Sequence, residues 1–409
     1  MSTSIPSSTA PGTPPEQPEE SRTPEPRSSR RQLAAADWIP SVTTTLAALV
    51  LALLIGAVLI ALSNRDVLET MPYFFSYPWD FFAESGHAIG SSYSALVTGS
   101  VGSLHAIGTT LVRSAPLICA GLGVTLAFRA GLFNIGAQGQ LLVGALAAGY
   151  VGFTWHLPPG VHLLVALVAG LAGGALWGGI AGVLKARTGA HEVITTIMLN
   201  YLAAALLIYC LGKDAFQRPG SDNTQSPPPL DSATFPALGD LHLGVVVAFL
   251  AAVLVWWLLS RSTLGFEMRA VGANPDASRT AGMNVPAVYT RAMVIAGGLA
   301  GLAATMGILG HHDSLSPTMA GSIGFDAITV ALLGRATPLG TVLAGLLFGA
   351  LSVGGVAMQA SPASTPKELT EVLQALIVLF VAAPALVQGL VRMKGSDSNE
   401  TVMAKGWGG

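Results

Sequence analysis

Charged residues are scarce in this chain. Asp, Glu, Lys and Arg make up 10% of its 409 residues and hydrophobic residues make up 51%, whereas soluble domains carry about 25% charged residues. The formal net charge is −2, so there is no basic excess to neutralise phosphates. The composition predicts a protein surrounded by membrane lipid and excludes nucleic acid as a main partner.

Cysteines and catalytic motifs are scarce too. Cys119 and Cys210 lie in apolar stretches without metal or disulfide spacing, which indicates small core residues. The Gly-Lys-Asp run at 212–214 lacks the glycine spacing and the hydroxyl of a phosphate-binding loop, and no nucleophile-elbow or zinc-protease motif occurs. The His-His-Asp run at 311–313 suits no metal, because adjacent residues cannot easily share one ligand geometry. We expect no catalytic residue, metal or cofactor in this chain.

Long apolar runs predict an all-α, polytopic membrane protein with about ten transmembrane segments, each able to cross about 30 Å of hydrocarbon. Nine runs are clear: 41–62, 108–128, 132–153, 161–184, 193–211, 243–260, 292–310, 339–358 and 370–391. A tenth, 321–334, is shorter, contains glycines and carries Asp326, so we expect a broken or re-entrant helix. The predicted membrane domain spans 39–392, between a polar tail at 1–38 that we expect to be disordered and a second tail at 393–409.

The basic residues orient these segments. With ten crossings, fifteen of the 20 Lys and Arg residues fall on the side of the N-terminus. The positive-inside rule therefore places both termini, and the connection 261–291, in the cytoplasm, with the protein in the plasma (inner) membrane. Of the two long outer connections, 63–107 is rich in aromatic residues. It is either an interfacial belt with a short amphipathic helix or a docking surface for an outer partner.

The connection 261–291 contains signals for a short helix. Asn274 can cap its start, Pro275 suits its first position, Ala277 to Ala281 continue it, and Gly282 can supply the left-handed residue that ends it. A helix of about two turns is marginal alone in water. Capping at both ends indicates a defined shape pressed against another surface; an ordinary connecting helix is the alternative.

Four phrases of this sequence resemble one family. GANPDASRTAGM, beginning at Gly272, resembles the coupling loop of permease subunits of ATP-binding-cassette importers, in the branched-chain amino acid, ribose and nucleoside group. The connection 261–291 is therefore called the coupling loop below. AFRAGLFNIGAQGQL (127–141), HEVITTIMLNY (191–201) and GFDAITVALLG (324–334) are similar to nucleoside permeases, in the same order. The resemblance covers about residues 40–392. One departure is Gln138, where a Glu is more often expected; the amide keeps a polar contact but not a charge.

The resemblance implies a heteromer that imports a small molecule. Its parts would be this chain, a second and shorter permease, an ATP-binding subunit on the cytoplasmic face, and a lipid-anchored substrate-binding protein outside. The ATPase subunit would bind and hydrolyse ATP and receive the short helix, including Gly272, Asn274, Pro275, Ala277, Ala281 and Gly282. A nucleoside is the expected substrate, with ribose or another simple sugar as the alternative. A secondary transporter is a third reading, but it should carry charged ion-coupling groups and repeated broken helices near the midplane.

Polar residues at the start of the third segment are candidates for the substrate pathway. Asn134 and Gln138 are four apart and would share one helical face, whereas Gln140 would point elsewhere. Three glycines within nine residues indicate a break in the helix. Amides beside the ring of Phe133 suit a neutral, polyhydroxylated ligand with a flat base. The alternative is that these amides hold the helices together.

Asp326 is an acidic residue well inside a predicted segment, where an unpaired carboxylate costs at least about 2.5 kcal/mol. Three arrangements would satisfy it: a pair with Arg113, backbone N–H donors at a helix break, or a segment end near water. We interpret it as a pathway residue. Glu192, beside Lys185 and Arg187, fits an ion cluster at the membrane boundary better than a proton relay.

Overall fold

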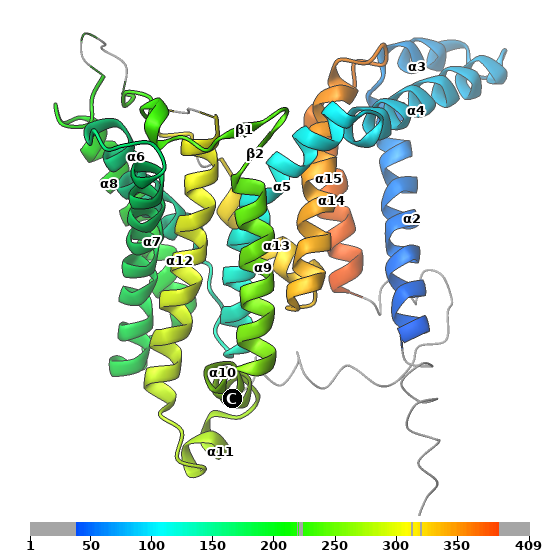
Figure 1. The fold of residues 1–409 in the computed structure, drawn as a ribbon. Helices are drawn as coiled ribbons and strands as arrows, with labels where there is room; N and C mark the ends of the chain where they lie inside the picture. The colour runs from blue at the N-terminus through cyan, green and yellow to red at the C-terminus, as the bar shows by residue number, and fades with distance from the viewer. Residues whose placement is uncertain (1–37, 219, 221–223, 312–313, 320, 384–409) are drawn as a thin grey trace, which may run out of the picture. The chain divides into compact units, whose positions relative to one another are not determined.

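The computed structural model describes residues 38–218, 220, 224–311, 314–319 and 321–383 (Figure 1). Apart from Trp38, the predicted tails 1–38 and 393–409 lie outside these residues. The chain from Thr44 onward forms one compact unit, and the packing described below belongs to it.

The described chain consists of helices and one small hairpin. In chain order the elements are α2 (Trp38–Ser63), α3 (Arg65–Thr70), η1 (Met71–Tyr73), α4 (Pro78–Val101), α5 (Leu104–Arg129), α6 (Ala137–Thr154), α7 (Val161–Thr188), α8 (Glu192–Leu211), η2 (Asp231–Ala233), β1 (Ala237–Leu238), β2 (Leu241–His242), α9 (Gly244–Arg261), α10 (Thr263–Ala273), α11 (Pro275–Thr280), α12 (Val285–His311), α13 (Ile323–Leu333), α14 (Pro338–Gln359) and α15 (Lys367–Ala382).

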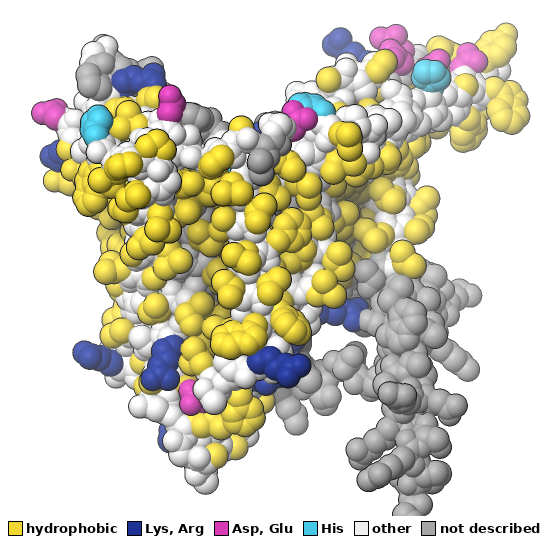
Figure 2. All heavy atoms as spheres, in the orientation of Figure 1, with side chains coloured by type: hydrophobic (Ala, Val, Ile, Leu, Met, Phe, Trp, Pro, Cys, Tyr) yellow, Lys and Arg dark blue, Asp and Glu magenta, His cyan; other side chains and the backbone are white. Residues whose placement is uncertain are grey.

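Seven of the described helices are long and apolar enough to cross a membrane: α2, α5, α7, α8, α9, α12 and α14. Helices α6, α13 and α15 occupy the three other predicted segments, although residues 384–391 of the last lie outside the described chain. Figure 2 shows hydrophobic side chains covering the middle of the visible face and most charged side chains near its two ends. The prediction of an all-α, polytopic membrane protein is confirmed.

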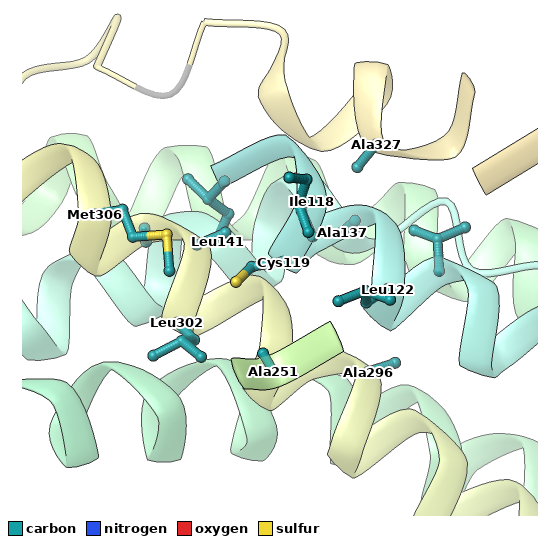
Figure 3. Packing of buried hydrophobic residues seen from close by; sticks show 14 of the residues in the cluster. Ile118, Cys119, Leu122, Ala137, Leu141, Ala251, Ala296, Leu302, Met306 and Ala327 are labelled. Carbon is teal, nitrogen blue, oxygen red and sulfur yellow. The ribbon is translucent and has the colours of Figure 1, made fainter. Parts of the chain in front are cut away.

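Helix α5 lies at the centre of the core. Of its apolar span, 83% is buried, because α6, α9, α12, α13 and α14 all pack against it. Figure 3 shows Ile118, Cys119 and Leu122 of α5 close to side chains of α6, α12 and α13. A helix enclosed by protein on nearly all sides can keep small and polar residues without exposing them to lipid.

Helices α7 and α12 meet along a seam of glycines. A Cβ atom on Gly174 would collide with the carbonyl oxygen of Gly297, and one on Gly301 would collide with that of Gly170. The two backbones therefore touch directly, as small residues allow in membrane helix pairs. We call these four glycines the α7–α12 seam.

The connection 63–107 differs from its prediction. It contains α4, a helix of 24 residues, where the sequence indicated at most a short amphipathic helix. Packing against α14 and the loop after it stabilises α4: Gly99 lies against Ala357 of α14, and Ser92 shares a hydrogen bond of 2.6 Å with Thr365 of that loop. Several aromatic residues before and within α4 are exposed, Phe75 by 97% and Trp79 by 80%, as either predicted role requires.

The second long connection, 212–242, carries the only strands of the described residues. β1 and β2 pair antiparallel, with Ala237 opposite His242 and Leu238 opposite Leu241. The intervening turn places Asp240 2.9 Å from the ring nitrogen of His105, at the start of α5. The hairpin is therefore tied to the central helix.

Candidate substrate pathway and coupling helix

The chain between α5 and α6 is not helical. Helix α5 ends at Arg129 and α6 begins at Ala137; residues 130–136 between them are called the α5–α6 connection below. Gly131 has a φ of +75°, a conformation that side chains with a Cβ rarely adopt. The predicted break is confirmed, and the third segment starts at residue 137 instead of 132.

Asn134 and Gln140 bond to each other inside this break. The Asn134 amide nitrogen donates to Gln140 Oε1 at 3.1 Å, and the Gln140 amide nitrogen donates to Asn134 Oδ1 at 3.2 Å. Asn134 Oδ1 also accepts from the backbone N–H of Gly136 at 2.9 Å. Both side chains are 1% exposed. The expectation that Asn134 shares a helical face with Gln138, and that Gln140 points elsewhere, is wrong because Asn134 precedes the helix.

Asn200 of α8 completes this network, although the sequence analysis gave it no role. Its Oδ1 accepts from the backbone N–H of Gly139 at 2.8 Å, and its Nδ2 donates to the carbonyl oxygen of Ile135 at 2.9 Å. These backbone groups have no helical partner, so a neighbouring side chain must satisfy them inside a membrane protein. An asparagine alone in an apolar helix was the signal that could have identified it.

Gln138 joins α6 to the start of α13. Its Nε2 donates to the carbonyl oxygen of Gly321 at 3.0 Å, and its Oε1 accepts from the backbone N–H of Gly324 at 2.8 Å. A carboxylate could not make the first of these bonds, because it has no donor. The side chain is partly exposed, unlike those of Asn134 and Gln140.

Phe133 lies in the same connection and is also partly exposed. Its ring and that of Phe128 have centroids 5.1 Å apart and are tilted by 32°. The structure thus keeps Phe133 and Gln138 accessible at the break, while Asn134 and Gln140 are enclosed.

Helix α13 is short, as predicted. Its 11 residues span about 16 Å at 1.5 Å per residue, which is too short to cross the hydrocarbon. Asp326 lies in its first turn, half-buried, and its Oδ2 accepts from the hydroxyl of Ser322 at 2.7 Å. Of the three arrangements considered for Asp326, the pair with Arg113 is not formed among the described residues, because Arg113 is exposed and makes no described ion pair with it.

The short helix of the coupling loop forms as the sequence predicts. Asn274 Oδ1 accepts from the backbone N–H groups of Asp276 and Ala277, at 3.1 and 3.0 Å. Pro275 occupies the first helical position, and Gly282 has a φ of +87°. Ala277 and Ala281 are exposed. The result is a small capped helix, α11, with exposed methyl groups.

Gly272, the first residue of the coupling-loop phrase, does not lie in or beside α11 as most other residues of that phrase do. It lies at the end of α10, a helix that the sequence analysis missed, and its backbone contacts Gly131: a Cβ on Gly131 would be 3.0 Å from Gly272 Cα. Next to this contact, Arg129 Nε donates to the carbonyl oxygen of Ala336 at 2.6 Å. The coupling loop therefore contacts the α5–α6 connection directly.

Two smaller expectations can be compared with the structure. Lys185 Nζ lies 2.8 Å from Glu192 Oε2, so the predicted boundary ion pair is confirmed. Among the described residues, no group of three His, Cys, Asp or Glu side chains is arranged to hold a metal ion.

Comparison with known proteins places these features in a family. Residues 106–382 match the model of the branched-chain amino acid transport system permease component. The guanosine ABC transporter permease protein NupP of Bacillus subtilis is 42% identical over 76% of this chain and 92% of its own length. The glucose ABC transporter permease protein TsgB13 of Haloferax volcanii is 36% identical (71% and 79%), and the nucleoside ABC transporter permease protein NupB of Lactococcus lactis is 33% identical (77% and 89%).

No solved structure matches the chain. The family match covers more than half of the chain, and each of the three relatives exceeds 30% identity over more than two thirds of it. The chain therefore belongs to the permease components of the branched-chain amino acid transport family, the multi-pass membrane subunits of ABC importers, which are not themselves catalytic.

Proposed function

We propose that this chain is the permease subunit of an ATP-driven importer for nucleosides. The observation that carries the proposal is the junction of α6 and α13, where a partly exposed amide, Gln138, bridges a helix break and a short helix that carries Asp326. Two relatives named for guanosine and nucleoside transport support the substrate class.

The substrate pathway passes this junction. The ring of Phe133 offers a surface for a flat base, and Gln138 and Asp326 offer hydrogen-bond partners for a neutral ligand. Asn134 and Gln140 do not contact the ligand themselves. Their paired amides hold the shape of the α5–α6 connection, and this connection presents Phe133 to the ligand. No cofactor is needed in this chain for such a role.

The partners follow from the exposed surfaces and from the family. A separate ATP-binding subunit docks on α11, whose exposed Ala277 and Ala281 permit close approach. A second permease completes the pathway, and a substrate-binding lipoprotein delivers the ligand from outside. The coupling loop and both termini are cytoplasmic.

Uptake by the assembled complex tests the substrate. Cells expressing the complete importer should accumulate labelled guanosine, and unlabelled nucleosides should compete while glucose should not. A simple sugar is the second candidate, because TsgB13 is named a glucose permease. Uptake of glucose or ribose without uptake of any nucleoside would replace the first proposal with the second.

Thiol labelling tests the orientation. In a background with Cys210 changed to Ala, Thr224→Cys should react with an impermeant reagent in intact cells, and Thr280→Cys should react only after the membrane is opened. Both positions are exposed. The reverse pattern would overturn the cytoplasmic placement of α11.

Co-purification tests the docking surface. Ala277→Glu should reduce recovery of the ATP-binding subunit in detergent, because a long charged side chain blocks close approach of α11. Ala83→Glu, at an exposed site on α4, is the matched control. Equal recovery with both variants would show that α11 is an ordinary connector.

A further inference from the structure

Helix α13 has two chemically different faces. Its buried face consists of small and apolar residues: Gly324, Ala327, Val330 and Ala331. Its other face, called the α13 polar face below, carries Ser322, Phe325, Asp326 and Thr329, which are exposed or half-buried. These four positions are spaced by three and four residues, so their side chains lie along one stripe.

The α13 polar face lies at membrane depth. Ala327 and Val330 pack against Gly121, eight residues before the end of the central helix α5, or about 12 Å inside it at 1.5 Å per residue. Figure 1 shows α13 between the two ends of the neighbouring spanning helices α5 and α14. This depth excludes an explanation of the polar residues by bulk water at a helix end.

The lipid-facing surfaces of this protein differ from the α13 polar face because they consist of large apolar side chains. The outward residues of α8, such as Ile194, Met198 and Leu202, are large, apolar and more than half exposed. A carboxylate cannot face hydrocarbon in the same way, because nothing there would satisfy its free oxygen. The two hydroxyls have partners within the helix: Ser322 donates to Asp326, and Thr329 donates to the carbonyl oxygen of Phe325. The α13 polar face therefore contacts water, substrate or another protein subunit.

The chemistry of this face is specific. Ser322 holds Oδ2 of Asp326, which orients the carboxylate and leaves Oδ1 without a bond to another described residue. A carboxylate accepts hydrogen bonds through two oxygens, and Asp or Glu recognises ribose hydroxyls in this way in nucleotide-binding folds. Phe325, 48% exposed, places an aromatic ring beside it.

We infer that the α13 polar face recognises the sugar of the substrate. Asp326 accepts hydrogen bonds from the 2′- and 3′-hydroxyls of a ribonucleoside, and Phe325 lies against its base. This inference rests on the proposed function and deepens it. It assigns selectivity for ribose, and against deoxyribose, to a helix in which the sequence indicated only Asp326 as a pathway residue.

Competition for guanosine uptake tests the inference in the complete importer. With the wild-type chain, 2′-deoxyguanosine should compete about tenfold less well than guanosine, because one hydrogen bond to a charged group is lost. Asp326→Asn should reduce this preference to about twofold, because it raises KM for guanosine, which loses two bonds to the carboxylate, more than KM for 2′-deoxyguanosine, which loses one. Asp80→Asn, an exposed carboxylate on α4, should keep the tenfold preference.

Several outcomes would overturn the inference. Equal competition by guanosine and 2′-deoxyguanosine in the wild type does so without any variant, and so does an unchanged preference in Asp326→Asn. If Asp326→Asn does not reach the membrane, Ser322→Ala serves instead, because it releases the carboxylate and should reduce the preference several-fold. Failure to transport any nucleoside overturns the proposed function as well, whereas nucleoside uptake without a sugar preference overturns this inference alone.

Discussion

Two glycine-rich regions of this protein use the same residue in opposite ways. In the α7–α12 seam, glycines such as Gly174 and Gly297 lie inside unbroken helices and bring two backbones into contact. In the α5–α6 connection, Gly131 takes a left-handed conformation and the helix stops. Glycine thus removes a side chain in the first region and releases the backbone in the second.

The consequences for polar groups differ accordingly. The helices of the seam satisfy their own backbone, so close packing is enough to stabilise it. The α5–α6 connection and the first turn of α6 expose backbone groups that need the amides of Asn134 and Asn200, and Gln140 holds the Asn134 side chain in place. A region that depends on a few side-chain hydrogen bonds can rearrange more easily than one held by backbone contact along two helices, which makes the connection the better place for a substrate pathway.

The coupling loop reaches both regions. Gly272 contacts Gly131 of the α5–α6 connection, and the chain leads from α11 through Gly282 into α12, one half of the seam. A movement of α11 relative to the rigid seam would therefore act on the connection. The predictions below separate these two contributions.

The largest effect is expected in the seam. Gly297→Ala places a methyl group against the carbonyl oxygen of Gly174, so the helices must separate, at a cost of about 3 kcal/mol or more. The melting temperature in detergent should fall by about 5–10 °C and little protein should reach the membrane. Gly307→Ala in the same helix, where a Cβ meets nothing within 4 Å, is the control. Similar melting of both variants would show that the seam does not stabilise the bundle.

The second effect is a loss of transport without a loss of the bundle. Gly131→Ala and Gly189→Ala both put a Cβ on a backbone with positive φ, +75° and +69°, which costs about 1–2 kcal/mol in each case. Only Gly131 faces Gly272; a Cβ on Gly189 meets nothing within 4 Å. Gly131→Ala should lower uptake about tenfold more than Gly189→Ala, at equal amounts of protein in the membrane. Equal uptake by the two variants would show that the contact between the coupling loop and the α5–α6 connection is not needed for transport.

The third effect separates two amides that the sequence could not tell apart. Asn134→Ala leaves a buried amide of Gln140 without its partner and should cost about 1–3 kcal/mol of stability, with an unchanged KM in the protein that remains folded. Gln138→Ala removes a partly exposed side chain and should raise KM for guanosine with a smaller loss of stability. Thermal melting and uptake kinetics of the two variants check this. If KM changes in Asn134→Ala and not in Gln138→Ala, the ligand contacts Asn134 and not Gln138.

The contrast between Asn134 and Gln138 also shows which features of the structure could be predicted from the sequence. Apolar runs, the caps of α11 and the short apolar segment of α13 follow from local chemistry, so they could be predicted. The pairing of Asn134 with Gln140 could not, because it depends on α6 starting at Ala137, and that start depends on Asn200 from α8. Helix α4 was missed for a similar reason: its Gly- and Ser-rich sequence is weakly apolar, and contacts with α14 and residue Thr365 stabilise it.

The smallest effect is expected at the cap of α11. Asn274→Ala removes the acceptor for two backbone N–H groups and should cost this helix about 1 kcal/mol. A six-residue helix has little else to hold it, so recovery of the ATP-binding subunit should fall several-fold while the melting temperature of the bundle stays the same. Asn284 makes the equivalent bond to Ala287 near the start of α12, a helix of 27 residues held by the seam, so Asn284→Ala should leave recovery unchanged. Equal recovery with both variants would mean that binding of the ATP-binding subunit depends on the position of the loop and not on the shape of α11.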